Sequence, residues 1–357
     1  MQEEKRKYNN SGGNIAASVN NNNSNSINDS VNSNNINNNS SNSDNSLKPS
    51  KRNELEITNI NNNSSNIDNS GVNHNINKIA ADDNLPSEKR NNDNGSSNLN
   101  IKYGKITLIG TGPGDIKHLT KTAVEAIEEC SVIIGYSTYL KQISNLLREE
   151  QKKLHFNMKD EITRCEAAIS KSMEGENVAV VSGGDAGIYG MSGLLLELLD
   201  KKSLIGKIPL DFIPGVPAFC AAACSIGAPI MNDFCVISLS NLLTPWKDIE
   251  KRLDFASKGD FVIIIYNPKS AKRKDELTNA KEILLKNIDK NRPSAIVKAA
   301  SRPDEEIVIT TLEHIDKFDL ISMNTTIIIG NSTTFVKDFY MITKRGYGNK
   351  YNSLNHR

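Results

Sequence analysis

The sequence predicts an α/β protein with two domains behind a long polar tail, and three observations support this prediction. From Lys105 onward, short β-branched runs alternate with amphipathic segments of helical length, a pattern typical of parallel strands covered by helices. The breaker-rich segment 227–230 (GAPI) interrupts the pattern and places a domain boundary near Asn232. The first 100 residues lack the pattern altogether. We therefore expect a tail at residues 1–100, domains at 101–232 and 233–347, and a short tail at 348–357.

The first 100 residues have the composition of a disordered chain. They contain 33 asparagines and one aromatic residue, Tyr8, and they show no apolar periodicity. Such a segment cannot bury enough apolar surface to offset the entropy lost on ordering. Asn-rich tracts can also self-associate. The simpler interpretation is a solvated tail, and we assign it no chemistry.

The first domain is expected to contain a parallel sheet, because its strands are separated by helices. The expected strands are Lys105–Ile109, Ser131–Ile134, Val178–Val181 and Ile208–Ile213. The expected helices are Leu119–Glu129, Tyr139–Glu150, Thr163–Glu174, Tyr189–Leu199 and Ala218–Ile226.

The second domain is expected to contain a mixed sheet. Its expected strands are Phe234–Leu239, Phe261–Tyr266, Ala295–Lys298, Glu306–Thr310 and Thr326–Ile329, and its expected helices are Trp246–Ser257 and Lys274–Asn287. The third and fourth of these strands are too close in sequence for a helical crossover, so they should pair antiparallel.

Charge and cysteine content exclude some classes of function. Beyond residue 100 the chain has 34 Lys and Arg against 31 Asp and Glu, too balanced for a general nucleic-acid binder. The start, MQEEKRKYNN, has no apolar leader, and no stretch is long and apolar enough to span a bilayer. Five cysteines form no CxxC pair. We therefore expect a cytoplasmic protein with reduced thiols, no protein-bound metal, and no nucleic-acid or membrane partner.

Three glycine-rich loops follow expected strands of the first domain. They are 110–115 (GTGPGD), 182–191 (SGGDAGIYGM) and 213–218 (IPGVPA), and the third leads into a helix of small residues. Open α/β sheets bind ligands at the carboxyl ends of their strands, where such loops let a ligand approach the backbone. Each loop alone is also compatible with a structural turn. Their coincidence predicts a shared pocket.

A dinucleotide site is the first alternative for these loops, and the residues disfavour it. Asp115 stands where a third glycine would be, Pro113 lacks an N–H, and the second strand ends at Gly135–Tyr136 without a ribose-binding acid. A nicotinamide-dependent oxidoreductase is therefore the weaker enzyme hypothesis.

The motifs GTGPGD, SGGDAGIYGM, IPGVPAFCAAACSIGAPI and TTIIIGNSTT, in this order, resemble the signature of the tetrapyrrole (corrin/porphyrin) methylases over residues 103–347. The segments 135–140 (GYSTYL) and 266–273 (YNPKSAKR) are similar to the precorrin-3B C17-methyltransferase branch of that family. Ala186 and Met191 depart from the GGDPxxFGRG pattern of the uroporphyrinogen methylase branch.

This resemblance implies two α/β domains, a homodimer, and S-adenosylmethionine (SAM) held in a cleft largely by backbone contacts. Two positions depart from many relatives, because Asn267 replaces Met and Ala300 replaces Gly. The SAM contacts carried over are Pro113, Gly183, Gly184, Asp185, Ile188, Pro217, Ala218, Asn267 and Ala300.

The resemblance also implies a reaction: methylation at C17 of a corrinoid tetrapyrrole with ring contraction, as a step of cobalamin biosynthesis. Methyl transfer from a sulfonium depends mainly on positioning. The acid/base candidates are Asp115, Tyr136 and Asp185, although an Asp such as Asp115 is as often a helix N-cap. Cations suited to the substrate's carboxylates are Lys269, Arg273 and Arg302, and Lys269 is equally compatible with a solvated face.

Two alternatives and one choice stay open at this point. The chain could be another tetrapyrrole methylase of the same pathway, or a non-catalytic SAM-binding protein tethered by its tail. The sequence does not distinguish a metal-free macrocycle from one that already carries cobalt.

Overall fold

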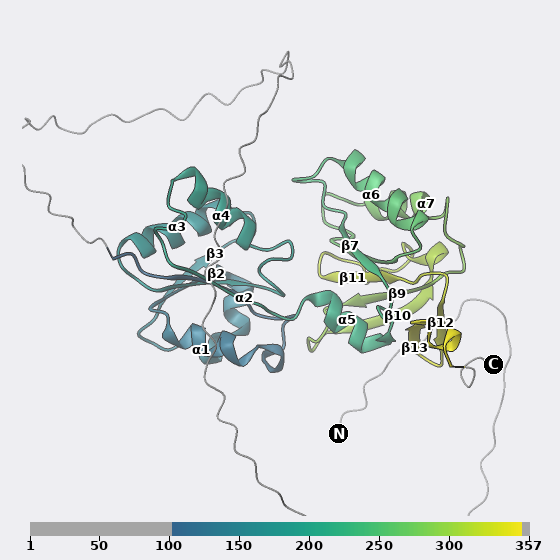
Figure 1. The fold of residues 1–357 in the computed structure, drawn as a ribbon, viewed down its shortest axis with the longest axis horizontal. Coiled ribbons are helices and arrows are strands. Elements are labelled where there is room, and N and C mark those ends of the chain that lie inside the picture. Colours follow the sequence, from purple (N-terminus) through teal and green to yellow (C-terminus); the bar gives the residue numbers. More distant parts are fainter. Residues whose placement is uncertain (1–101, 352–357) are drawn as a thin grey trace, which may run out of the picture. The chain divides into compact units, whose positions relative to one another are not determined.

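The computed structural model describes residues 102–351. The predicted tail at residues 1–100 lies outside the described residues, as do residues 352–357. Within the described part, the strands form two sheets of five strands and one sheet of three. Figure 1 shows the two larger sheets, one built from residues before Asn232 and one from residues after it.

The first sheet is parallel throughout, with the order β3-β2-β4-β1-β5. Its strands are β1 (Ile106–Gly110), β2 (Val132–Tyr136), β3 (Lys152–Phe156), β4 (Val178–Ser182) and β5 (Leu210–Ile213). Its helices are α1 (Lys121–Glu129), α2 (Ser137–Gln142), α3 (Glu161–Met173) and α4 (Ser192–Lys201). Helices α3 and α4 cover one face and α1 and α2 the other (Figure 1). The central strands β1 and β4 are buried on both faces, which explains their continuous apolar runs.

The second sheet is mixed, with the order β10-β9-β11-β8-β7. Its strands are β7 (Phe234–Ser238), β8 (Val262–Tyr266), β9 (Pro293–Lys298), β10 (Glu306–Thr311) and β11 (Thr325–Ile329). Strands β9 and β10 pair antiparallel, so the predicted mixed sheet is confirmed. Strand β11 runs antiparallel between β8 and β9, which brings its first residues to the carboxyl ends of both.

Three helices cover the second sheet. On one face, α6 (Trp246–Lys258) and α7 (Glu276–Leu284) pack over a core that includes Leu253 and Ile265. On the other face lies α5 (Ala218–Ile226), whose buried alanines contact β8, β9 and β11. Small side chains let α5 lie close to the sheet, and this fixes where its first residues stand.

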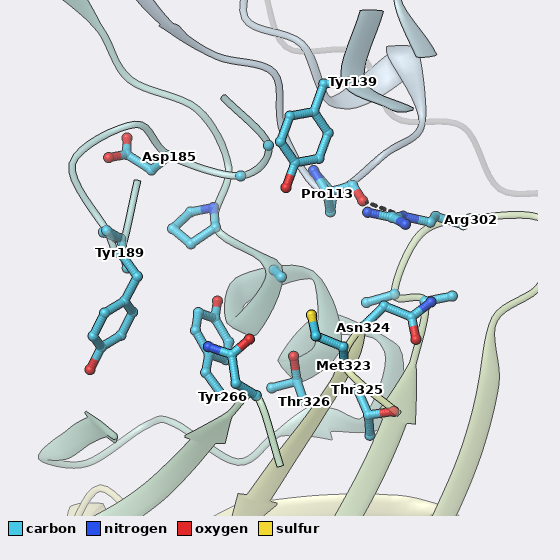
Figure 2. Close-up of a pocket in the computed structure, with 18 residues that line it drawn as sticks. Pro113, Tyr139, Asp185, Tyr189, Tyr266, Arg302, Met323, Asn324, Thr325 and Thr326 are labelled. Atoms are coloured by element: carbon cyan, nitrogen blue, oxygen red, sulfur yellow. Dashed lines mark hydrogen bonds between the residues drawn. The ribbon is translucent and has the colours of Figure 1, made fainter. Parts of the chain in front are cut away.

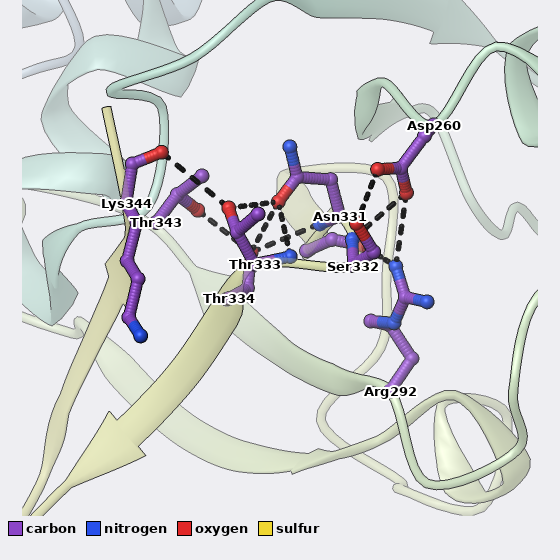
Figure 3. Close-up of polar contacts among 9 residues, drawn as sticks. Asp260, Arg292, Asn331, Ser332, Thr333, Thr334, Thr343 and Lys344 are labelled. Atoms are coloured by element: carbon purple, nitrogen blue, oxygen red, sulfur yellow. Dashed lines mark hydrogen bonds and ion pairs between the residues drawn. The ribbon is translucent and has the colours of Figure 1, made fainter. Parts of the chain in front are cut away.

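The third sheet joins β6 (Gly227–Ala228), β12 (Thr334–Lys337) and β13 (Tyr340–Thr343). Figure 3 shows the side chains that support it. The Thr334 hydroxyl lies 2.7 Å from that of Thr343, which donates to the Pro229 carbonyl at 2.5 Å. Nearby, Ser332 donates from its backbone N–H and its hydroxyl to Asp260. The second half of the TTIIIGNSTT motif is therefore scaffold, because it attaches β12 and β13 to the second sheet.

Two predicted helices differ from the structure. The helix expected over Tyr139–Glu150 is wrong: α2 ends at Gln142, a 3-10 turn follows at Ser144–Leu146, and β3 comes next. Strand β3 was missed because its residues, KKLHF, are largely polar, and it is an edge strand that pairs only with β2. The helix expected from Tyr189 begins instead at Ser192, because Tyr189 has a left-handed backbone with φ 52°.

The described residues contain no helix long and apolar enough to cross a membrane. All five cysteines are free. Burial raises the pKa of the Cys130 thiol to about 11 and that of Cys165 to about 12. Both thiols are therefore protonated at neutral pH and act as core packing groups.

Candidate active site

A pocket of about 210 Å³ lies where the carboxyl ends of strands from both large sheets meet the start of β11 (Figure 2). Its residues come from the segments after β1, β2, β4, β5 and β9, from the end of β8 and the residue after it, and from the segment around the start of β11. Carboxyl ends of parallel strands are where open α/β sheets place ligands. The lining residues are Pro113, Tyr139, Gly183, Gly184, Asp185, Ile188, Tyr189, Pro217, Ala218, Tyr266, Asn267, Ala299, Ala300, Arg302, Met323, Asn324, Thr325 and Thr326.

The three glycine-rich loops touch one another through their backbones. Gly112 and Gly184 form an antiparallel bridge, with N–H to carbonyl distances of 3.1 and 2.7 Å. A Cβ on Gly215 would lie 2.1 Å from the Gly184 carbonyl oxygen, and one on Gly110 would lie 2.5 Å from the Gly215 nitrogen. Gly110 and Gly215 are therefore required for close contact between the loops, and the predicted convergence of the three loops is confirmed.

Asp185 holds two of these loops together. One carboxylate oxygen accepts from the Gly187 N–H at 2.8 Å, within its own loop. The other oxygen accepts from the Gly215 N–H at 3.0 Å, in the next loop. Both oxygens of this carboxylate thus bind backbone amides and fix the pocket wall.

Gly184 leaves a space that a side chain would fill. Its φ of +66° is left-handed, and a Cβ there would meet only the Ala218 nitrogen and the Pro217 Cα, each at 3.8 Å. The second loop therefore presents bare backbone toward the start of α5. A SAM molecule held by backbone contacts needs such an exposed main chain, so the residues present fit that cofactor.

Three pocket residues other than glycine have left-handed backbones: Tyr189, Asn267 and Ala299, with φ of 52°, 52° and 51°. Each such conformation costs about 1–3 kcal/mol and persists only where neighbours impose it. At Asn267, the Arg273 guanidinium donates to the backbone carbonyl at 2.7 Å, and the side-chain amide donates to the Ser238 hydroxyl at 2.9 Å. Three of the eight non-glycine residues with left-handed backbones in the described part of the chain therefore line this pocket, and at Asn267 the neighbouring side chains hold that conformation.

The three pocket tyrosines differ in their hydroxyl partners. The Tyr189 hydroxyl donates to the Val236 carbonyl at 3.0 Å, and the Tyr266 hydroxyl accepts from the Phe219 N–H at 2.8 Å. Burial raises the pKa of Tyr139 and Tyr189, and it raises the pKa of Tyr266 to about 12. All three are therefore neutral phenols at physiological pH.

Arg302 connects the second sheet to the first loop. Its Nε donates to the Pro113 carbonyl at 2.8 Å, and its side chain lies against Gly114, where a Cβ would be 2.6 Å from Nε. Figure 2 shows the guanidinium beside Pro113 at the pocket wall. Gly114 is thus needed to admit this arginine, and the pocket acquires a fixed positive charge.

The structure brings most of the predicted site residues together. The residues predicted to contact SAM all line the pocket, as does Arg302: Pro113, Gly183, Gly184, Asp185, Ile188, Pro217, Ala218, Asn267 and Ala300. Their individual roles stay predictions.

Four predicted site residues do not line the pocket. Asp115 caps the 3-10 helix at Ile116–His118, accepting from the Lys117 N–H at 2.9 Å. Tyr136 packs edge-to-face on Tyr139, with ring centroids 5.3 Å apart. Arg273 donates to the carbonyls of Leu239 and Asn267, and Lys269 lies between Asn267 and Arg273 in the same loop. The roles given to these four also stay predictions.

The pocket also contains residues that the SAM-contact prediction omitted: Tyr139, Tyr189, Tyr266, Ala299, Met323, Asn324, Thr325 and Thr326. The last four surround the start of β11. No signal in the sequence pointed to these four, because the close spacing of β9 and β10 fixes only their own antiparallel pairing. The start of β11 reaches the pocket because β11 runs antiparallel to both β8 and β9.

The fold and the pocket are those of an α/β protein that binds a ligand at the carboxyl ends of its strands. Sequence comparison identifies the family. The chain belongs to the tetrapyrrole (corrin/porphyrin) methylases, whose family profile matches residues 105–316. The predicted family is therefore confirmed, and with it a SAM-dependent methyltransferase domain.

Two relatives and one solved structure are particularly similar. The cobalt-factor III methyltransferase of Priestia megaterium is 45% identical over 250 residues, which are 70% of this chain and 46% of that protein. The probable cobalt-factor III C(17)-methyltransferase of Salmonella typhimurium is 45% identical over 242 residues, 68% of this chain and 99% of that protein. The crystal structure of the methyltransferase CobJ matches with a TM-score of 0.64 at 32% identity, over 68% of this chain and 100% of that one. The chain thus spans about half of the first relative and nearly all of the second.

Proposed function

We propose that this protein is a SAM-dependent C17-methyltransferase of cobalamin biosynthesis, acting on precorrin-3B or its cobalt form with contraction of the ring. One observation carries the proposal: nine residues that the resemblance to the tetrapyrrole methylases assigns to SAM, from separate segments of the chain, line a single pocket. The names of the two relatives, which specify cobalt-factor III, support the same substrate class.

We propose that SAM binds in this pocket against the second loop and the start of α5. When bound, it supplies an activated methyl group to a carbon nucleophile. Gly183 and Gly184 offer backbone without side chains, and Asp185 keeps that loop in place through its two amide contacts. The chain therefore contributes mainly positioning and exclusion of water.

The macrocycle carries several carboxylates, so fixed cations should surround the pocket. Arg302 is the predicted clamp that lines it, while Lys269 and Arg273 follow the pocket residue Asn267 in the chain. Asp115, Tyr136 and Asp185 remain our candidates for proton transfer. Of these, Asp185 is inside the pocket, where its two carboxylate oxygens accept from the Gly187 and Gly215 N–H groups.

We further propose a cytoplasmic homodimer with domains at 101–232 and 233–347, each holding one of the five-stranded sheets. The homodimer follows from the resemblance to the tetrapyrrole methylases. Cobalt, where present, belongs to the substrate, and we propose no metal bound by the protein itself.

The test is to incubate the purified protein with labelled SAM and precorrin-3B in one reaction, and with labelled SAM and cobalt-factor III in another. The mass of each product is then measured. We expect one added methyl group with at least one of the two macrocycles, and the preferred one identifies the oxygen-dependent or the anaerobic route. Methylation of a different pathway intermediate would instead support another methylase of the pathway. Binding of S-adenosylhomocysteine without any turnover would support a non-catalytic protein, and binding of NAD(P) alone would contradict the proposal.

A further inference from the structure

The hydroxyl of Tyr139 differs from those of the other two pocket tyrosines. The hydroxyls of Tyr189 and Tyr266 are each hydrogen-bonded to a backbone group of the protein. Among residues 102–351, the Tyr139 hydroxyl has no hydrogen-bond partner, although its ring lines the pocket. A phenol inside a pocket is seldom left unpaired, so this hydroxyl is available to a ligand.

The position of Tyr139 is fixed by its neighbours. It lies in α2, and its ring packs edge-to-face on Tyr136 at 88°. On its other side is Gly183, where a Cβ would come within 2.6 Å of the ring and 3.0 Å of the hydroxyl oxygen. Gly183 therefore makes room for Tyr139, and the two residues form one wall of the pocket. Figure 2 shows the hydroxyl directed into the pocket.

Arg302 lies on the same side of the pocket as Tyr139 (Figure 2). Only its Nε is engaged, by the Pro113 carbonyl, so its terminal amino groups make no hydrogen bond or ion pair within the described part of the chain. Glu305, three residues further along the chain, makes no ion pair with Arg302 in the described part of the chain, and its Oε2 accepts from the Ser301 N–H and the Ser225 hydroxyl. The positive charge of Arg302 also opposes the rise in the pKa of Tyr139 that burial causes.

We propose that the Tyr139 hydroxyl and the terminal amino groups of Arg302 together form a carboxylate-binding site in the pocket wall. A neutral phenol and a guanidinium both donate, and a carboxylate accepts from both, which is a strong, charge-assisted arrangement. The inference deepens the proposed function and rests on it. Two carboxylates could occupy the site: that of the methionine part of the cofactor, or one of those on the macrocycle.

The test is Tyr139→Phe, which removes only the hydroxyl and keeps the ring against Gly183. The matched control is Tyr103→Phe, at a tyrosine that packs against the core of the first sheet and does not line the pocket. Calorimetry would measure the affinity of both variants and the unaltered protein for S-adenosylhomocysteine and for methylthioadenosine, which lacks the carboxylate. Thermal unfolding would check that each variant is folded.

A cofactor carboxylate at the site predicts that Tyr139→Phe weakens S-adenosylhomocysteine binding by about 10- to 100-fold while methylthioadenosine binding is unchanged. If the site binds a carboxylate of the macrocycle, Tyr139→Phe should leave the affinities for S-adenosylhomocysteine and methylthioadenosine unchanged. The KM for the tetrapyrrole should then rise by about 10- to 100-fold, with kcat little changed. Unchanged values in every assay would overturn the inference. A failure of the proposed function would be visible in the unaltered protein, which would then neither bind S-adenosylhomocysteine nor turn over. A failure of the inference alone would leave both activities of the unaltered protein intact.

Discussion

Substitution of Gly184 by valine tests whether the second loop must present bare backbone to the cofactor. The change adds a branched side chain at a φ of +66°, directed toward Pro217 and Ala218 with 3.8 Å to the nearest atoms. The left-handed backbone costs a residue with a Cβ about 1–2 kcal/mol. That cost corresponds to a fall in Tm of roughly 2–8 °C in a chain of this size. The fold should therefore survive, while the added carbons occupy the space reserved for the cofactor.

The matched control is Gly206→Val, because Gly206 also has a left-handed φ, +79°, but a Cβ there meets no atom within 4 Å and the residue does not line the pocket. Both variants should lose similar stability in a thermal unfolding assay. Only Gly184→Val should lose affinity for S-adenosylhomocysteine, by at least about 100-fold, or roughly 2.7 kcal/mol. Equal affinity of the two variants would refute the assignment of the second loop to the cofactor site.

Three further perturbations have defined outcomes. Deleting residues 1–100 should leave turnover per folded molecule unchanged, because every residue that we assign to the site lies at Pro113 or beyond, and a large loss in a well-folded truncate would show that the tail acts in catalysis. Arg273→Lys keeps the charge but loses the guanidinium that donates to the Leu239 and Asn267 carbonyls, so S-adenosylhomocysteine affinity measured by calorimetry should fall about tenfold. Equal affinity would show that Asn267 holds its conformation without this arginine. Tyr266 has a folded-state pKa of about 12 against an ordinary 10.0, so it stabilises the fold below pH 10 and that contribution is lost as pH rises toward 12. Tyr266→Phe should therefore reduce the alkaline fall in Tm, and an unchanged fall would contradict the account.

The buried parallel strands could be predicted because burial on both faces selects continuous β-branched runs, as in β1, β4 and β8. Strand β3 could not, since an edge strand is stabilised by pairing with β2 and its own residues are polar. Strands β12 and β13 were missed for a related reason. Hydrogen bonds between threonines and pairing with β6 hold these two strands in place. Neither kind of contact requires the alternating apolar residues by which a strand is recognised in a sequence.

The glycine loops of the site could be predicted because a turn with close backbone contact admits few other residues. The function of a polar side chain in those loops could not. Arg273 has the chemistry of a carboxylate clamp, yet its guanidinium donates to two backbone carbonyls, and only the folded loop places those groups beside it. The place of Tyr139 in the pocket could not be predicted either, because its approach to Gly183 depends on the pairing of β2 with β4.

The most direct test of the central claim is the position of the methyl group in the product. The purified protein would be given SAM carrying an isotope-labelled methyl group, together with whichever macrocycle it accepts, and the product would be assigned by NMR. We predict a single labelled methyl group on C17 of a contracted ring. A labelled methyl group on any other carbon, or an intact macrocycle with no label, would contradict the assignment.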